Sequence, residues 1–264
     1  MKNRDSRTKW IDSPPKEFLL PDLAKKRAVV TGSSQGIGRA TVQALLANGA
    51  RVFGLDCAAC DLQHERFSPI RCDLGNVADI VKAFLEISTL VSGLDCIVNV
   101  AGNDPKNPMD EVTVEQWDQL LDLNLKAYYF VIKHGLPLLR RGSGQSIVNV
   151  SSINYRLGIS GRAPYAVTKA GILGLTTGLS RELGKENIRI NTVSPGWVFT
   201  ARQISNYFSG SAAPKNLEHL ARQQSIPLKI LPADIANHIL FYLSEVSRAS
   251  TGHNCVVDSG WILE

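Results

Sequence analysis

The chain has 264 residues, of which 44% are hydrophobic and 20% are charged. These proportions are typical of a soluble globular protein and exclude the collagen-like, disordered and disulfide-stapled classes. No apolar run approaches the ~18 to 20 residues that span a bilayer, and the first residues lead into no apolar signal core. We therefore expect a cytoplasmic protein with no membrane partner.

The net charge of +5 is concentrated at the beginning of the chain. Residues 1–30 contain eight Lys or Arg and four Asp or Glu, so the rest of the chain is close to neutral. A folded body without a basic face argues against a nucleic-acid partner. Docking of the basic N-terminal tail to an acidic surface is the alternative that the charge leaves open.

The five cysteines are an odd number in a chain without a secretion signal, so we expect reduced thiols. Cys57 and Cys60 have the C-x-x-C spacing of some metal sites, and His64 and Cys72 follow them. No second closely spaced ligand pair completes a structural zinc site, so we expect no bound metal.

The order of elements begins with residues 1–24, which carry scattered charges without periodicity and predict an extended, partly ordered N-terminal arm. From residue 25 onward, short apolar stretches alternate with helical patterns. The expected strands are 28–30, 51–55, 69–72, 94–98, 146–150, 189–193 and 254–257, and the expected helices are 36–47, 76–91, 115–140, 164–183 and 233–244. This alternation predicts an α/β fold: a single Rossmann-type, doubly wound parallel sheet with helices on both faces, in one domain over residues 25–264.

Residues 197–232 interrupt the pattern, with Gly210 and Pro214 among polar side chains. The segment follows the sixth strand, at the edge where an open α/β sheet binds its ligand. We therefore expect an irregular, mobile substrate lid. An ordinary surface excursion is the alternative.

A glycine-rich turn, TGSSQGIG, follows the first strand and opens the first helix. Three glycines permit a tight turn and a close approach of the backbone, and the unpaired amides and the dipole of a helix N-terminus favour an anion. The turn therefore predicts a site for the pyrophosphate of a dinucleotide. Its residues are Gly32, Ser34, Gln35, Gly36, Ile37 and Gly38.

Asp56 ends the second strand, 18 residues beyond Gly38, which is close to the ~20-residue offset of the acid that binds the ribose hydroxyls. A carboxylate there repels a 2′-phosphate, and neighbouring positions in the sequence offer no compensating base, so we predict NAD rather than NADP. Asp73, with Leu74 after it, is expected to bind the adenine. The wall of the cofactor site is expected from the residues that follow the fourth strand, namely Asn99, Ala101 and Gly102. A capping or turn role is the alternative for these residues.

Tyr165 and Lys169 are four residues apart in a helical segment and therefore share one face. Ser152, just after the fifth strand, and Asn124, in an earlier helix, are expected at the same edge of the sheet. This set suggests alcohol oxidation, in which a base removes the hydroxyl proton while a nicotinamide takes the hydride. A free tyrosine has a pKa near 10, but a neighbouring ammonium and a positive nicotinamide ring are expected to lower that pKa. Ser152 would bind the substrate oxygen, and Asn124 would hold a water that links Lys169 to solvent.

Over residues 25–262 the chain resembles the short-chain dehydrogenase/reductase family. The glycine turn resembles the glycine motif of the family, and its four catalytic positions match Asn124, Ser152, Tyr165 and Lys169. The resemblance implies a loop that places the nicotinamide carboxamide, through Pro195, Gly196, Val198 and Thr200. It also implies a homotetramer or homodimer built on two long helices. Two departures are Val100, where the family usually has a second asparagine, and Ser259, where it usually has a glycine; neither removes a catalytic group.

The stretches 101–104, 152–155, 200–203 and 250–253 are similar to members of that family that act on sugars, notably D-xylose-type aldose dehydrogenases. Polar side chains follow several strand ends, namely Asn103, Asp104, Asn154, Arg156, Arg202 and Gln203. Buried donors aimed at hydroxyls discriminate strongly against apolar ligands, so we expect a polar, polyhydroxylated small-molecule substrate such as an aldose. The two arginines leave open a sugar acid or another hydroxy acid. A protein that binds NAD without turnover is the alternative of another class.

Overall fold

The computed structural model describes residues 9–263, so residues 1–8 of the predicted arm lie outside the described residues. Within the described range, seven strands form one parallel sheet. They are β1 (Arg27–Thr31), β2 (Arg51–Asp56), β3 (Phe67–Arg71), β4 (Cys96–Asn99), β5 (Ser146–Val150), β6 (Arg189–Pro195) and β7 (Asn254–Val257). Their order is β3-β2-β1-β4-β5-β6-β7, so the chain builds one half of the sheet outward from β1 and then the other half. The predicted doubly wound α/β fold is confirmed.

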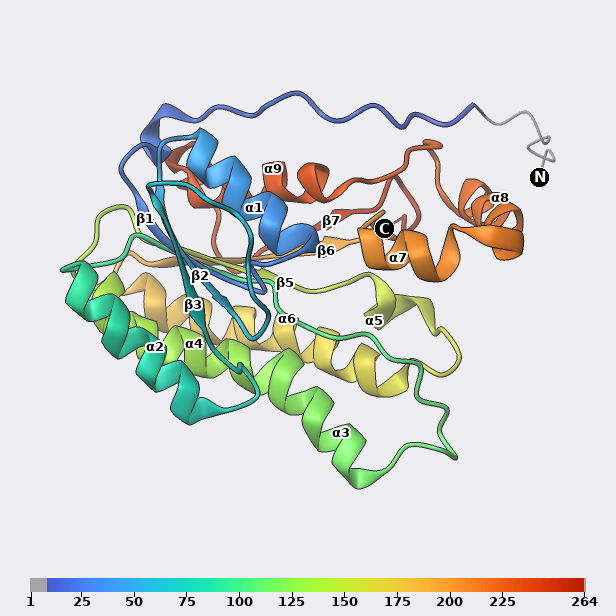
Figure 1. The fold of residues 1–264 in the computed structure, drawn as a ribbon, viewed down its shortest axis with the longest axis horizontal. Coiled ribbons are helices and arrows are strands. Elements are labelled where there is room, and N and C mark those ends of the chain that lie inside the picture. Colours follow the sequence, from blue (N-terminus) through green and yellow to red (C-terminus); the bar gives the residue numbers. More distant parts are fainter. Residues whose placement is uncertain (1–8, 264) are drawn as a thin grey trace.

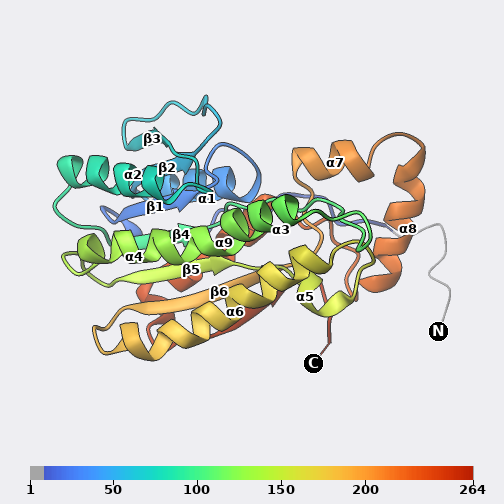
Figure 2. The same ribbon diagram turned by 90° about the horizontal axis from the view of Figure 1, so that it is seen from below.

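Helices cover both faces of this sheet, as Figures 1 and 2 show from two directions. One face carries α1 (Gly36–Ala47) and α9 (Pro232–Leu243), which pack side by side. The other face carries α2 (Val77–Leu90), α4 (Ala127–Leu139) and α6 (Ala163–Gly184). The carboxyl edge of the sheet is therefore the side left for a ligand.

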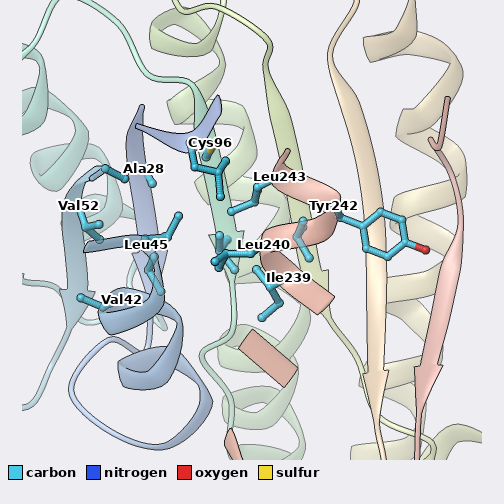
Figure 3. Close-up of a cluster of buried hydrophobic side chains, with 14 of the residues drawn as sticks. Ala28, Val42, Leu45, Val52, Cys96, Ile239, Leu240, Tyr242 and Leu243 are labelled. Atoms are coloured by element: carbon cyan, nitrogen blue, oxygen red, sulfur yellow. The ribbon is translucent and has the colours of Figure 1, made fainter. Parts of the chain in front are cut away.

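The two faces of the sheet bury two separate hydrophobic cores because successive side chains of a strand point to opposite sides. In β1, Ala28 and Val30 belong to the core beneath α1 and α9, whereas Val29 belongs to the core beneath α2 and α4. Figure 3 shows the first core, where Leu45 of α1 and Leu240 of α9 meet the strands. Strands buried on both faces fix the sheet as a rigid base for the site.

The helix expected over 115–140 is interrupted in the structure. A π-helical turn, η2 (Asp122–Lys126), separates α3 (Val114–Leu121) from α4, and it contains Asn124. Such turns insert one residue into a helix and occur frequently at functional sites. Hydrophobic periodicity does not reveal a single inserted residue, which is why the sequence predicts an uninterrupted helix.

The lid segment 197–232 is largely helical, so the expectation of irregular structure is wrong. It contains α7 (Ala201–Tyr207) and α8 (Ala213–Gln223), joined by a short 3₁₀ turn. The hydroxyl of Thr200 caps α7 by accepting a hydrogen bond from the N–H of Gln203. Pro214 lies in the first turn of α8, where proline starts a helix rather than breaking it.

The N-terminal residues 9–24 run across the face of the molecule that carries α1 and α9 (Figure 1). Leu20 is buried in the core there, and its N–H donates to Oδ1 of Asn48 at 2.5 Å. Farther toward the N-terminus, Ile11 forms a parallel bridge with Leu228, just after α8. The arm therefore joins the body of the sheet to the base of the lid.

Candidate active site

The glycine turn between β1 and α1 has a shape that only glycine supports. Gly32 and Gly36 have positive φ angles of 65° and 56°, and a Cβ at Gly38 would lie 1.9 Å from the carbonyl oxygen of Gly32. Within the described part of the chain, the side chain of Gln35 makes no capping hydrogen bond at the start of α1. The amides of this first turn are thus available to a phosphate, and the turn fits the pyrophosphate of a dinucleotide.

Asp56, at the end of β2, holds this turn through its carboxylate. Its Oδ2 accepts hydrogen bonds from the N–H and the Oγ of Ser34 at 3.0 and 2.7 Å, and its Oδ1 accepts one from the N–H of Ala58 at 2.9 Å. A carboxylate offers about four acceptor positions, so a ribose hydroxyl still fits. Arg71 of β3 lies opposite Asp56 in the register of the two strands. Arg71 therefore places a positive charge near Asp56. The residues adjacent to Asp56 in the sequence did not indicate this charge.

A cavity of about 510 Å³ adjoins this end of the sheet, on the side where adenine is expected. Asp73 lines it, and its Oδ1 accepts a hydrogen bond from the N–H of Gly75 at 2.9 Å. Leu74 is buried beside it. The cavity is lined by Cys57, Arg71, Asp73, Asp79 and Lys82.

A second cavity, of about 650 Å³, opens at the carboxyl ends of the central strands. The predicted cofactor residues that line it are Ile37, Gly102, Pro195, Gly196, Val198 and Thr200. The predicted catalytic and substrate residues that line it are Asn103, Asp104, Ser152, Asn154, Tyr165, Lys169, Arg202 and Gln203. Residues that lie far apart in the sequence therefore meet in one site.

Ser152, Tyr165 and Lys169 form one wall of this cavity. The Nζ of Lys169 donates to the carbonyl oxygen of Val150 at 3.0 Å and lies 5.6 Å from the centre of the Tyr165 ring. A hydrogen bond joins the side chains of Tyr165 and Ser152. The helix α6 and the end of β5 thus place a hydroxyl, a phenol and an ammonium together.

Asn124 is fully buried behind this wall. Its Oδ1 accepts from the N–H of Asn103 at 2.9 Å, and its Nδ2 donates to the carbonyl oxygen of the same residue at 2.8 Å. A Cβ at Gly102 would lie 3.2 Å from Oδ1 of Asn124, so glycine permits this close approach. The π turn therefore fixes the segment that leads to the substrate side of the cavity. The water-holding role of Asn124 stays a prediction.

Burial dominates the electrostatics of the catalytic wall. Burial raises the pKa of Tyr165 to about 12, and the charge of Asp104 adds to this increase. Burial also lowers the pKa of Lys169 to about 8. The pKa of Tyr165 is therefore raised by its protein surroundings, whereas the sequence predicts a lowering by Lys169 and a nicotinamide ring together; the effect of the ring stays a prediction. Desolvation disfavours the phenolate of Tyr165 and the ammonium of Lys169. Both pKa shifts therefore favour the neutral phenol and the neutral amine.

Asp104 connects the lid to the rest of the site. Its carboxylate forms an ion pair with Arg202 and accepts a hydrogen bond from Nε2 of Gln203 at 3.1 Å. Arg162, at the start of α6, approaches its Oδ2 at 3.4 Å. Arg202 also donates to Oδ1 of Asn103 at 3.0 Å. Four of the predicted substrate residues are thus brought together, and Arg162 joins them although no sequence pattern indicated it.

Arg156 and Asn99 are among the predicted site residues that line neither cavity. Arg156 is exposed on the short helix α5 (Asn154–Leu157) and does not line the substrate cavity, whereas Asn154 does. Residues two positions apart in a helix do not share a face, which explains the difference. Asn99 is buried at the end of β4, where its Nδ2 donates to Oδ1 of Asn149 at 2.9 Å. Its side chain therefore links two strands inside the protein rather than forming a cofactor wall.

The far end of the cavity contains residues that sequence reasoning missed. They come from the loop after β4, the start of α6, the lid and the C-terminal segment, and they are Lys106, Arg162, Tyr207, Asn216, His219, Gln223 and Trp261. The amphipathic spacing of α8 could have identified which face of the helix points inward. No sequence signal indicated that this face reaches the cavity.

The structure bears on the C-x-x-C spacing of Cys57 and Cys60 and on whether any helix could span a membrane. Cys57 and Cys60 are free thiols. Over residues 9–263, no group of three or more His, Cys, Asp or Glu side chains is arranged to hold a metal ion. Across the same residues, every helix is too short or too polar to traverse a bilayer.

Comparison with known proteins places this architecture. A family model described as enoyl-(acyl carrier protein) reductase matches residues 32–262. D-xylose 1-dehydrogenase of Caulobacter vibrioides is 33% identical over 252 residues, which cover 92% of this chain and 98% of that protein. The "Probable galactose dehydrogenase GalD" of Rhizobium meliloti is 33% identical over 259 residues, which cover 94% and 98%. The solved ligand-free structure of Thermoplasma acidophilum aldohexose dehydrogenase shares the fold with a TM-score of 0.85 at 24% identity, covering 92% of this chain and 96% of that one.

The fold, the phosphate turn and these matches over nearly the whole chain define a nicotinamide-dependent oxidoreductase. Within that class, the chain belongs to the short-chain dehydrogenase/reductase family. Its cofactor is accordingly a nicotinamide dinucleotide.

Proposed function

We propose that the protein is an NAD-dependent dehydrogenase that oxidises one carbinol carbon of a neutral polyhydroxylated molecule, an aldose or a related sugar. The observation that carries this proposal is the ion pair between Arg202 and Asp104 at the cavity. Because Asp104 balances the charge of Arg202, the lid offers hydrogen-bonding groups to a neutral ligand rather than a clamp for a carboxylate. The names of two relatives refer to xylose and galactose, which supports the same substrate class.

A sugar acid is the second candidate, and the placement of the arginines argues against it. Arg156 lies outside the cavity, and Arg202 is already paired. Aromatic side chains favour a sugar further. Trp197 and Tyr207 line the cavity. Nε1 of Trp197 donates to Gln203 at 2.9 Å, and the hydroxyl of Tyr207 accepts from Arg162 at 3.2 Å, so each ring has a polar contact besides apolar carbon surface for the C–H side of a sugar ring.

In this proposal Tyr165 removes the proton of the substrate hydroxyl and Ser152 binds the same oxygen. The positive charge of Lys169 favours the phenolate of Tyr165 and so opposes the burial that raises the pKa of Tyr165. The nicotinamide, when bound, supplies the hydride acceptor and a positive ring that also favours the phenolate. The residues that would hold the nicotinamide end are Ile37, Pro195, Gly196, Val198 and Thr200.

The choice of NAD rests on Asp56, whose carboxylate is fixed against the glycine turn by Ser34. A negative charge held at this point repels a 2′-phosphate. Arg71, opposite Asp56, is the residue that would favour NADP instead. The cofactor comparison is therefore part of the test.

The test is a screen of kcat/KM with NAD and NADP across neutral aldoses, polyols, aldonates and apolar secondary alcohols. We expect an aldose with NAD to give the highest value. A tenfold higher value for an aldonate or an apolar alcohol would contradict the substrate, and equal use of NADP would contradict the cofactor. Complete absence of turnover with every alcohol would favour a protein that binds the dinucleotide without catalysis. Tyr165→Phe serves as the background control.

A further inference from the structure

Tyr128, in the first turn of α4, lies directly behind the catalytic lysine. It is 1% exposed, and its hydroxyl donates to the carbonyl oxygen of Val150 at 3.0 Å. The Nζ of Lys169 donates to the same oxygen at 3.0 Å. The Nζ also lies 5.5 Å from the centre of the Tyr128 ring and 5.6 Å from that of Tyr165. The ammonium is therefore placed near two phenol rings and shares its acceptor with Tyr128.

We propose that Tyr128 is a positioning residue for Lys169: its ring stabilises the ammonium, and its hydroxyl fixes the Val150 carbonyl that orients Nζ. A cation within about 6 Å of an aromatic ring is attracted by the ring's quadrupole, and the attraction is stronger where water is excluded. A carbonyl oxygen has two lone pairs, so it accepts both hydrogen bonds. The proposal rests on the proposed role of Tyr165 as the base.

The fold explains why Tyr128 reaches this place. Tyr128 follows Asn124 by four residues, and the π turn η2 lies between α3 and α4. One inserted residue rotates the following helix by about 100° relative to an uninterrupted α-helix. The neighbouring Tyr129 is 44% exposed, so a change of one position in this register would turn the buried ring toward the surface. The π turn therefore sets two parts of the site, Asn124 and Tyr128.

The direction of the effect follows from the charges around Lys169. Burial lowers the pKa of Lys169 to about 8, and an attractive ring opposes that change. Without the ring, the ammonium becomes less favourable, and Tyr165 loses a positive neighbour that favours its phenolate. The charged and titratable groups that face this pair are Tyr128 from α4, Asp104 from the segment after β4, and, around Tyr165, Arg162 and Arg202.

The experiment measures the pH dependence of kcat/KM for alcohol oxidation by the full chain and two variants. In Tyr128→Leu, the midpoint of the rise with pH should move upward by about one unit, which lowers kcat/KM about tenfold below the midpoint. Tyr128→Phe keeps the ring and loses the hydroxyl, so its midpoint should move upward by less. Tyr242→Leu is the matched control, because it removes a buried tyrosine from the core beneath α9. It should lower the thermal midpoint of unfolding and leave the pH midpoint unchanged.

An unchanged pH midpoint in both Tyr128 variants would overturn the proposal, and so would an equal shift in Tyr242→Leu. If Tyr128→Leu does not fold, the Tyr128→Phe profile decides by itself: an upward shift supports the proposal and an unchanged midpoint overturns it. The profile is measured with whichever alcohol and cofactor the enzyme turns over. A wrong substrate assignment is therefore distinguishable from a wrong role for Tyr128.

Discussion

The cofactor half and the substrate half of the active site are built in different ways. The cofactor half depends on the backbone: the glycine turn occupies eight consecutive residues, 31–38, and its shape excludes side chains at Gly38. The substrate half depends on side chains that meet across long separations, such as Arg202 and Asp104, which are 98 residues apart. Steric demands on the backbone can be predicted from a short stretch of sequence, whereas pairs of distant side chains are identified only in the folded structure.

The largest expected effect lies where the two halves meet. Tyr165→Phe removes the transferable proton with little change in volume and should lower kcat by at least ~10²-fold, within the range usual for general acid–base groups. Cofactor affinity should change little, because the glycine turn does not depend on this residue. Steady-state kinetics and a cofactor-binding titration measure the two quantities. Near-normal turnover in the variant would exclude Tyr165 as the base.

A substitution in the substrate half should alter substrate binding without altering cofactor binding. Asp104→Asn weakens the charge-assisted contacts that hold α7, and a loss on the order of one such hydrogen bond corresponds to a roughly tenfold rise in the KM of the sugar. The dissociation constant of the cofactor should stay the same. Glu186→Gln is the control, because it removes the partner of an exposed ion pair with Arg140 far from the lid. Equal effects of the two substitutions would refute the role of Asp104.

A substitution in the cofactor half should alter cofactor use rather than substrate binding, and the effect should be smaller. Asp56→Ala should narrow the preference for NAD over NADP several-fold, since one repulsive charge disappears. Ser34→Ala removes the hydroxyl bound to Asp56 but keeps the carboxylate, so it should weaken both cofactors alike. Values of kcat/KM for both cofactors test this. The role of Asp56 is contradicted if Asp56→Ala leaves the NAD-to-NADP ratio of kcat/KM unchanged, or if Ser34→Ala changes that ratio as much.

The smallest effect on catalysis is expected outside both halves, on the exposed face of α6. Val167 is 46% exposed there, and the predicted homotetramer or homodimer would bury it. Val167→Arg places a charge in that interface, so it should shift the assembly toward monomers while kcat changes by less than about threefold. Size-exclusion chromatography with light scattering measures the mass, and Leu85→Arg on α2 is the control. A monomeric parent protein would contradict the predicted assembly.

Agreement between sequence and structure follows the same division. The turn at Gly32 to Gly38 was predicted because its requirement is local, and the central strands were predicted because burial on both faces makes them continuously apolar. The edge strand β3 begins at Phe67 rather than Pro69; only Phe67 and Ile70 of its five residues are buried, so its sequence pattern is weaker. Tyr128 and Arg162 were missed because their partners are brought near only by the π turn and by the lid.

The bridge between Ile11 and Leu228 has a consequence for how the chain is made. Lys229 and Asp12, which pair beside that bridge, are 217 residues apart. At 5 to 20 residues per second, the ribosome needs roughly 10 to 40 s to travel between them. During that interval the arm has no partner at the base of the lid, while β1 and α1 already have neighbours. Ile11 and Asp12 are thus synthesised long before Leu228 and Lys229, so this contact beside the lid forms late.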